Sequence, residues 1–433
     1  NRLAAPMVAA AILSNLQSVI NLFWVGRLGS DAVASVAIAG TILMILFPLL
    51  MGLSTGTVAL VARAAGSQRW NDAGEAASQS IILSAILGLL TAGVGWYFSS
   101  ALFRLLGAEP AVIAHGVGYL RVFLLGSFTG FILFTGNAAL QGAGDTMRPM
   151  YLMALSNILN ILLDPVFIFG LGPFPRMGVS GAALASVLSQ TVAAVAAIHL
   201  MFSGKTPLAV RFSQWKPNLS LSWRLLRIGI PGSGMMFSRS LMSAVLMRVV
   251  ADHGTAAVAA YGTGLRFHML ILMPAFAIGG AAATMVGQNL GAGKPERAHK
   301  AAWLATGIDS LIMVLSALVL MIFAAPLIRL FNSDPQVVAI GAQYLVIVSP
   351  FYVFAAVGIV LSRALNGAGD TMAPMIITIL TLWGLQVPLA VGLSKLWHPA
   401  TYGIWWAIAV AMVVNGLLTA AWFQTGRWRH KKV

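Results

Sequence analysis

Long apolar segments recur along the whole of this chain and are separated only by short stretches rich in glycine, proline or charged residues. A hydrocarbon core about 30 Å thick requires roughly 20 mostly apolar residues in each helix that crosses it. The pattern therefore predicts an all-α integral membrane protein. Its twelve expected transmembrane helices lie at about residues 3–26, 32–61, 79–101, 113–140, 149–170, 178–202, 225–251, 256–287, 301–325, 337–363, 373–394 and 401–424.

The composition excludes several other classes of protein. Of the 433 residues, 59% are hydrophobic and 9% are charged, whereas about a quarter of a soluble domain is charged. The net charge of +15 does not indicate binding of nucleic acid, because the 26 Lys and Arg are scattered between apolar segments. The chain has no cysteine, which excludes disulfides and thiolate metal sites.

The positions of the basic residues predict the orientation of the chain. If connections alternate between the two sides of the membrane, 17 Lys and Arg fall on the side that holds both termini, six fall on the other side, and Arg239, Arg248 and Arg266 lie within helices. The positive-inside rule then places the termini in the cytoplasm. The longest polar connection, residues 203–223, lies on the same side, so we predict six-helix bundles at 1–202 and 224–433 joined by a cytoplasmic linker at 203–223.

An internal repeat relates the two halves. The segment GAGDTMRPM at 142–150 recurs as GAGDTMAPM at 367–375, a shift of 225 residues, and the same shift takes Tyr119 to Tyr344. Because each repeat has an even number of helices, both enter the membrane from the same side and their symmetry axis runs along the membrane normal. Two such bundles can rock around a central cavity, which favours a transporter over a channel, although a duplicated unit can also serve only as a stable bundle.

One acidic residue stands out inside the fifth apolar segment. Asp164 follows Asn157 by seven residues and Asn160 by four, so the three share one face of a helix. A carboxylate within a bilayer is costly and is a functional candidate by default. Pro165 removes a backbone donor and is expected to kink the helix there. These oxygens suit a proton relay or a sodium site, and the alternative is that the stripe only joins helices through hydrogen bonds.

Other polar residues inside apolar segments are weaker candidates. The first segment offers Asn15, Gln17 and Asn21, with Pro6 as a second position for a kink. Asp309, in the ninth segment, either pairs with a cation such as Arg266, faces water, or serves as a second ion or substrate site. The remaining candidates for a substrate or ion pathway are Asn137 and Gln190.

The repeated GAGDT loops favour a structural role. Asp145 and Asp370 can each cap the helix that follows, and glycine permits the tight turn before it. Neither these loops nor GQNLGAGK has the spacing of a phosphate-binding loop, so ATP hydrolysis is not expected.

Several motifs in this order resemble one known family. They are FWVGRLGSDAVAS after the first segment, NILLDPVFIFGLG in the fifth, GQNLGAGKPERA after the eighth, and the paired GAGDT loops. Together they are similar to the multidrug and toxic compound extrusion (MATE) transporters of the multidrug/oligosaccharidyl-lipid/polysaccharide flippase superfamily. The resemblance covers essentially the whole chain. It implies two six-helix lobes in a V shape, and export of drugs coupled to inward flow of protons or sodium ions.

The resemblance also carries expectations for single residues. In the family, the aspartate and asparagine that match Asp164 and Asn160 belong to the cation-coupling site, which implies a possible sodium site at these two residues. The position of Asn21 is commonly an aspartate essential for coupling, and Arg239 takes a place where some branches carry a functional glutamate. Asn21 has nearly the shape of a protonated aspartate but releases no proton. It is therefore either a substituted coupling residue, a natural departure in a protein that couples through Asp164, or a helix-packing amide.

We thus expect a monomeric, multi-pass protein of a bacterial or archaeal plasma membrane that exports lipophilic or cationic molecules, contacts membrane lipids and binds no nucleic acid. No cofactor is expected apart from the coupling ion. Two alternatives are a flippase for lipid-linked oligosaccharides, whose cavity would be basic, and a membrane-embedded enzyme. The enzyme is disfavoured because no cysteine exists and no histidine adjoins an intramembrane acid in sequence.

Overall fold

The structure is a computed structural model that describes residues 17, 20–204, 206–208 and 210–431. Most of these residues are helical, and short loops connect the helices. No strand occurs among these residues. Eleven helices within the described ranges are long and apolar enough to cross a membrane. The first predicted segment lies mostly outside those ranges, as do Pro6 and Asn15, but residues 20–26 are helical. The expectation of an all-α membrane protein is confirmed.

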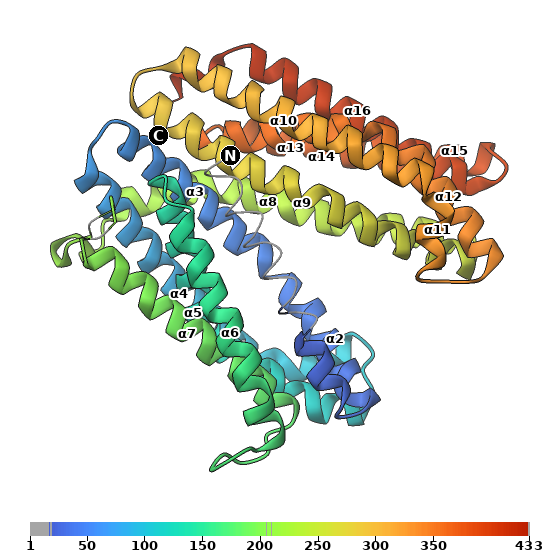
Figure 1. The fold of residues 1–433 in the computed structure, drawn as a ribbon, viewed down its shortest axis with the longest axis horizontal. Helices are drawn as coiled ribbons and strands as arrows, with labels where there is room; N and C mark the ends of the chain where they lie inside the picture. Colours follow the sequence, from blue (N-terminus) through green and yellow to red (C-terminus); the bar gives the residue numbers. More distant parts are fainter. Residues whose placement is uncertain (1–16, 18–19, 205, 209, 432–433) are drawn as a thin grey trace. The chain divides into compact units, whose positions relative to one another are not determined.

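The chain divides into two compact units, residues 1–230 and 231–433. Helix α8 (Leu219–Ala251) runs across this boundary, which falls directly before Pro231. Figure 1 shows the units in blue to green and in yellow to red. The helices of the first unit that precede α8 are α2 (Ser30–Met44), α3 (Phe47–Gly66), α4 (Trp70–Leu105), α5 (Pro110–Gly142), α6 (Met147–Phe169), α7 (Val179–Phe202) and the short 3-10 helix η1 (Phe212–Trp215).

The second unit contains the remaining helices. They are α9 (Thr255–Gly291), α10 (Pro295–Ile322), α11 (Ala324–Arg329), α12 (Pro335–Val348), η2 (Ser349–Phe351), α13 (Tyr352–Gly367), α14 (Met372–Ile379), the π-helical η3 (Leu380–Gln386), α15 (Val387–Leu396), α16 (Ala400–Gln424) and η4 (Arg427–His430). Helices α4 and α9, with 36 and 37 residues, are each roughly 55 Å long at 1.5 Å per residue. They exceed the thickness of a bilayer core and extend beyond it.

Three predicted segments are not single regular helices. The segment at 32–61 breaks at Ile45 and Leu46, because Pro48, the second residue of α3, provides no amide hydrogen for the helix before it. The segment at 337–363 contains the tighter turn η2 around Pro350 for the same reason. The segment at 373–394 widens into the π-helix η3 before Pro388.

The linker after α7 is hydrogen-bonded to the N-terminal part of α4, chiefly through one buried side chain of α4, Gln79. The amide of Gln79 donates to the carbonyl oxygen of Lys216 at 2.7 Å and accepts from the backbone N–H of Asn218 at 3.0 Å. Asn218 also donates to Glu75 at 2.9 Å. The linker and the start of α8 therefore belong to the first unit, whereas the sequence placed the second bundle from residue 224.

The 225-residue shift relates packing contacts between helices as well as amino-acid identities. A methyl group added at Gly142 would meet the carbonyl oxygen of Val58, and one added at Gly367 would meet that of Ala283, the residue that matches Val58. Both glycines let helices approach to backbone contact. In the same way Gly116 lies against Phe103, and its counterpart Gly341 lies against Ile328. The duplication is thus preserved in the packing of each unit.

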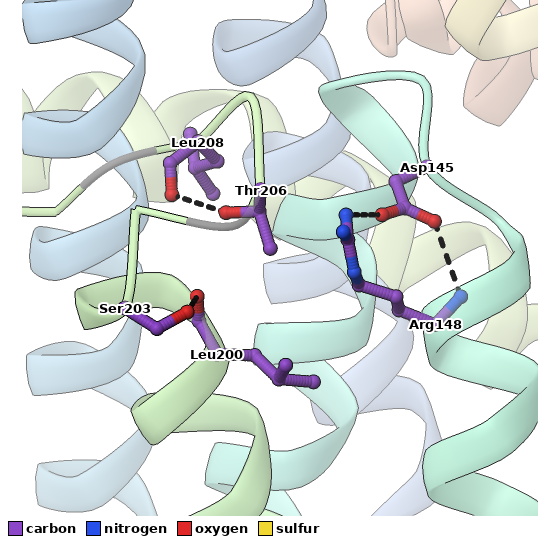
Figure 2. Close-up of polar contacts among 6 residues, drawn as sticks. All are labelled: Asp145, Arg148, Leu200, Ser203, Thr206 and Leu208. Atoms are coloured by element: carbon purple, nitrogen blue, oxygen red, sulfur yellow. Dashed lines mark hydrogen bonds and ion pairs between the residues drawn. The ribbon is translucent and has the colours of Figure 1, made fainter.

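The two repeated loops differ in how their aspartates are used. In the first loop, Asp145 accepts the backbone N–H of Arg148 at 3.1 Å and also pairs with its guanidinium, as Figure 2 shows. This confirms the expected capping role of Asp145. Asp370 has no such bond to its own helix among the described contacts, and the position that matches Arg148 is Ala373, which has no guanidinium to pair with it. Its carboxylate instead accepts from two residues near the C-terminus.

Candidate functional site

Asp164 is buried completely inside the first unit, on α6. Its Oδ1 accepts a hydrogen bond from Asn160 Nδ2 at 3.2 Å. Its Oδ2 is also buried and has no hydrogen-bond partner among the described residues. A buried carboxylate oxygen without a donor is expensive, so this atom is the natural place for a proton or a small cation.

Asn160 links the acid to a second helix. The same Nδ2 that donates to Asp164 also donates to Ser186 Oγ of α7 at 3.2 Å. Its Oδ1 is buried without a partner in the described part of the chain. Carboxyl, amide and hydroxyl oxygens from two helices are therefore gathered at one point, and two of them are still able to accept a bond.

A glycine brings these two helices together. A Cβ at Gly181 of α7 would collide with the carbonyl group of Phe167, one turn beyond Asp164 on α6. The absence of a side chain allows the backbones to touch, which puts Ser186 within reach of Asn160. Helix α6 continues through Pro165 to Phe169, so this proline interrupts one hydrogen bond without ending the helix.

Two further buried polar side chains belong to the same unit. Asn157 is buried on α6, and its Nδ2 has no partner among described residues. Tyr119 is buried on α5 and interacts electrostatically with Asp164. The sequence did not identify Ser186 or Tyr119 as site residues. For Tyr119 there was a signal, since it matches Tyr344 in the repeat, whereas Ser186 is one of many serines in apolar segments.

Asn21 lies on a helix that packs beside α6. The rings of Trp24 and Phe169 contact each other edge to face, with centroids 6.1 Å apart. Asn21 is half-buried, and its Oδ1 is buried without a partner among the described residues. No hydrogen bond joins it to Asp164 or Asn160 within the described contacts. Asn21 therefore presents one more unsatisfied oxygen from a neighbouring helix.

The weaker pathway candidates lie on helices other than that of Asp164. Gln17 is half-buried, and the side-chain oxygen of Gln190 lies over Gly130 of α5. Asn137, also on α5, has a buried Oδ1 with no partner in the described ranges. None of the three is hydrogen-bonded to the Asp164 site in the contacts that the structure describes.

Asp309 belongs to the other unit, on α10, and is fully buried. Neither of its carboxyl oxygens has a hydrogen-bond partner among described residues. The ion pair with Arg266 that the sequence allowed is not formed. Arg266 is exposed, and its guanidinium lies 5.9 Å from the ring centroid of Phe331.

The described residues contain no group of three or more His, Asp or Glu side chains that could hold a metal ion. The Asp164 site offers a single negative charge with neutral amide and hydroxyl ligands. Such a set can exchange a proton or hold a monovalent cation with weakly charged oxygen ligands. The fold and this site define a multi-pass helical membrane transporter, built from two repeated units with a buried acid in the first.

Comparisons with known proteins agree with this class. The MatE family model matches residues 6–166 and again 231–391. The chain belongs to the MatE family, which confirms the resemblance to MATE transporters and the duplication. The family and its relatives are transporters rather than enzymes.

Individual relatives cover nearly the full chain. A probable multidrug resistance protein NorM of Thermotoga maritima is 29% identical, over 100% of this chain and 93% of the relative. An FAD transporter of Shewanella oneidensis is 30% identical, over 86% of this chain and 82% of the relative. A crystal structure of MATE in the straight conformation matches with a TM-score of 0.90 at 28% identity, over 98% of this chain and 94% of the other.

Proposed function

We propose that this chain is a secondary active multidrug exporter that moves lipophilic or cationic small molecules against a proton or sodium gradient. Export of drugs is supported by relatives named as multidrug resistance proteins in several bacteria. Coupling to an ion is supported by Asp164, and alternating access between the two sides of the membrane by the two repeated units.

The single observation that carries the coupling is the state of the Asp164 carboxyl group. One oxygen is held by Asn160 and the other has no donor among the described residues, although the residue is completely buried. A carboxyl group in this setting is stabilised when a proton neutralises it or when a cation binds its open oxygen. Exchange of that occupant across the membrane provides the driving force for export.

We further propose a monomer in a bacterial or archaeal plasma membrane, with cytoplasmic termini, no cofactor apart from the coupling ion, and no nucleic-acid partner. The positive-inside distribution of Lys and Arg supports this orientation. The eleven apolar helices of the described chain agree with a multi-pass protein that contacts lipid.

Transport in proteoliposomes tests the proposal. Purified wild type and Asp164→Asn are reconstituted, proton and sodium gradients are imposed in turn, and efflux of the cationic dye rhodamine B ethyl ester is followed. We expect one gradient to drive efflux by the wild type and neither to drive efflux by Asp164→Asn. Counterflow of the dye, which needs no gradient, reports whether the variant still binds and moves it.

Asp309→Asn is the matched control, because it removes by the same change an acid that, like Asp164, is fully buried. Gradient-driven efflux lost only in Asp164→Asn supports coupling in the first unit. Equal loss in both variants, or full efflux by Asp164→Asn, contradicts this assignment.

A further inference from the structure

Arg239 carries a positive charge in the interior of α8, far from either end of that helix. It lies 12 residues before Ala251, which corresponds to about 18 Å at 1.5 Å per residue. Its side chain is half-buried, and its Nε is buried without a hydrogen-bond partner among described residues. A cation at this depth of a bilayer is costly unless a counter-charge is present.

Two other basic side chains lie within electrostatic range of Arg239. It interacts electrostatically with His268 of α9 and with Arg363 of α13. His268 lies 13 residues after the start of α9 at Thr255, which is about 20 Å along that helix and matches the depth of Arg239. Arg363 lies four residues before the end of α13 at Gly367, and its guanidinium is 5.6 Å from the ring centroid of Phe276.

These side chains are held in place by the packing of the second unit. Trp383 Nε1, in the π-helical η3, donates to Ser238 Oγ at 2.8 Å and so fixes α8 beside Arg239. The ring Nδ1 of His268 and the hydroxyl of Tyr352 are 3.1 Å apart. The basic groups are therefore positioned before any partner binds, which lowers the entropic cost of binding.

No acid of the second unit supplies the counter-charge to Arg239 in the described structure. Asp252 pairs with Arg248, Glu296 with Arg429, and Asp370 with Lys431. Asp334 accepts the backbone N–H of the first turn of α12. Asp309 is buried with neither oxygen bonded to any described residue.

We propose that Arg239, together with His268 and Arg363, forms a binding site for the anionic group, a carboxylate or a phosphate, of a transported molecule. The planar guanidinium of Arg239 matches the two oxygens of such a group. This inference rests on the proposed transport function and refines its substrate class. It adds anionic and zwitterionic molecules to the lipophilic cations expected from the sequence.

A pair of dyes that differ only in the carboxyl group tests this site. Rhodamine B has a free carboxylate, and rhodamine B ethyl ester has the same cationic ring system with that charge removed. Binding of each to the purified protein in phosphatidylcholine nanodiscs is measured by fluorescence anisotropy. We expect Arg239→Gln to raise the Kd for rhodamine B about tenfold or more, and that for the ester less than about twofold.

Two variants serve as controls. Arg239→Lys keeps the charge but not the planar fork, so its affinity for rhodamine B should lie between those of the wild type and Arg239→Gln. Arg248→Gln removes an exposed arginine of the same helix that is already paired with Asp252, so it should bind both dyes as the wild type does. A loss of affinity for both dyes in Arg239→Gln, or for neither, overturns the site.

The source of the anion and the proposed function are tested separately. If phosphatidylglycerol in the nanodiscs abolishes rhodamine B binding by wild type, the site takes a lipid phosphate and the assignment to substrate fails. Unchanged binding supports the assignment. Gradient-driven efflux of the ester by wild type tests the transport function itself, which stands or fails independently of Arg239.

Discussion

The ammonium group of Lys431 lies 3.2 Å from Oδ1 of Asp370, so the end of the chain supplies the cation that the second repeat has lost. In the first repeat the cation is Arg148, three residues after Asp145. The second repeat has Ala373 at the matching position, and Trp422 Nε1 donates to the other oxygen of Asp370 at 3.0 Å. Asp370 thus joins the repeated loop to α16 and to the C-terminal segment.

The contact between Asp370 and Lys431 predicts different losses of folding stability when each residue is replaced by alanine. The side chain of Asp370 is 4% exposed, and that of Lys431 is 48% exposed. Asp370→Ala removes two partly buried charge-assisted contacts and should cost about 1–3 kcal/mol, a drop of several degrees in the apparent Tm. Lys431→Ala should cost under about 1 kcal/mol, because the pair is partly solvated. Thermal unfolding in detergent at one scan rate measures both, and equal drops contradict this view.

Asn160 should matter more for coupling than Asn157. Asn160→Ala removes the donor shared by Asp164 and Ser186, so we expect gradient-driven efflux to fall several-fold. Asn157→Ala removes an amide whose Nδ2 has no partner among the described residues, and efflux should change little. The measurement is the initial rate of gradient-driven efflux by each variant in proteoliposomes with matched protein content. The prediction is wrong if Asn157→Ala is the more damaging change.

Asn21→Asp tests whether the first helix holds a disabled coupling site. The oxygen of Asn21 is buried without a partner in the described part of the chain, and its helix contacts α6 through Trp24 and Phe169. An aspartate there can release a proton, which the amide cannot. We expect gradient-driven efflux to increase several-fold, with Asn21→Ala as the control that only removes the amide. No increase on Asn21→Asp would show that the amide serves packing.

Gly181→Ala should disturb the site from a distance. The added methyl group collides with the carbonyl of Phe167 and forces α6 and α7 apart, at a cost of about 1–3 kcal/mol. Both the apparent Tm and coupled efflux should fall. Gly93→Ala is the matched control, because Gly93 is exposed on α4 with open space around it and alanine favours a helix. Similar losses in the two variants would contradict a role for this close approach.

The sequence was sufficient for the features that depend on local composition and on repetition. Apolar segments of membrane-spanning length predicted the helices, and the recurrence of the GAGDT segment predicted the duplication that the paired contacts of Gly142 and Gly367 preserve. Asp164 and Asn160 were accessible as candidates because residues four apart share one helix face. Prolines at 48 and 350 interrupt helices within segments that hydrophobicity alone had joined.

Only the tertiary structure decided which distant side chains meet. Ser186 reaches Asn160 because Gly181 lets two helices touch, and Lys431 reaches Asp370 because the chain end folds back onto the second unit. His268 of α9 and Arg363 of α13 lie within electrostatic range of Arg239 of α8. Periodicity fixes the face of one helix on which a residue lies, whereas the neighbours of that face depend on packing between helices far apart in the chain.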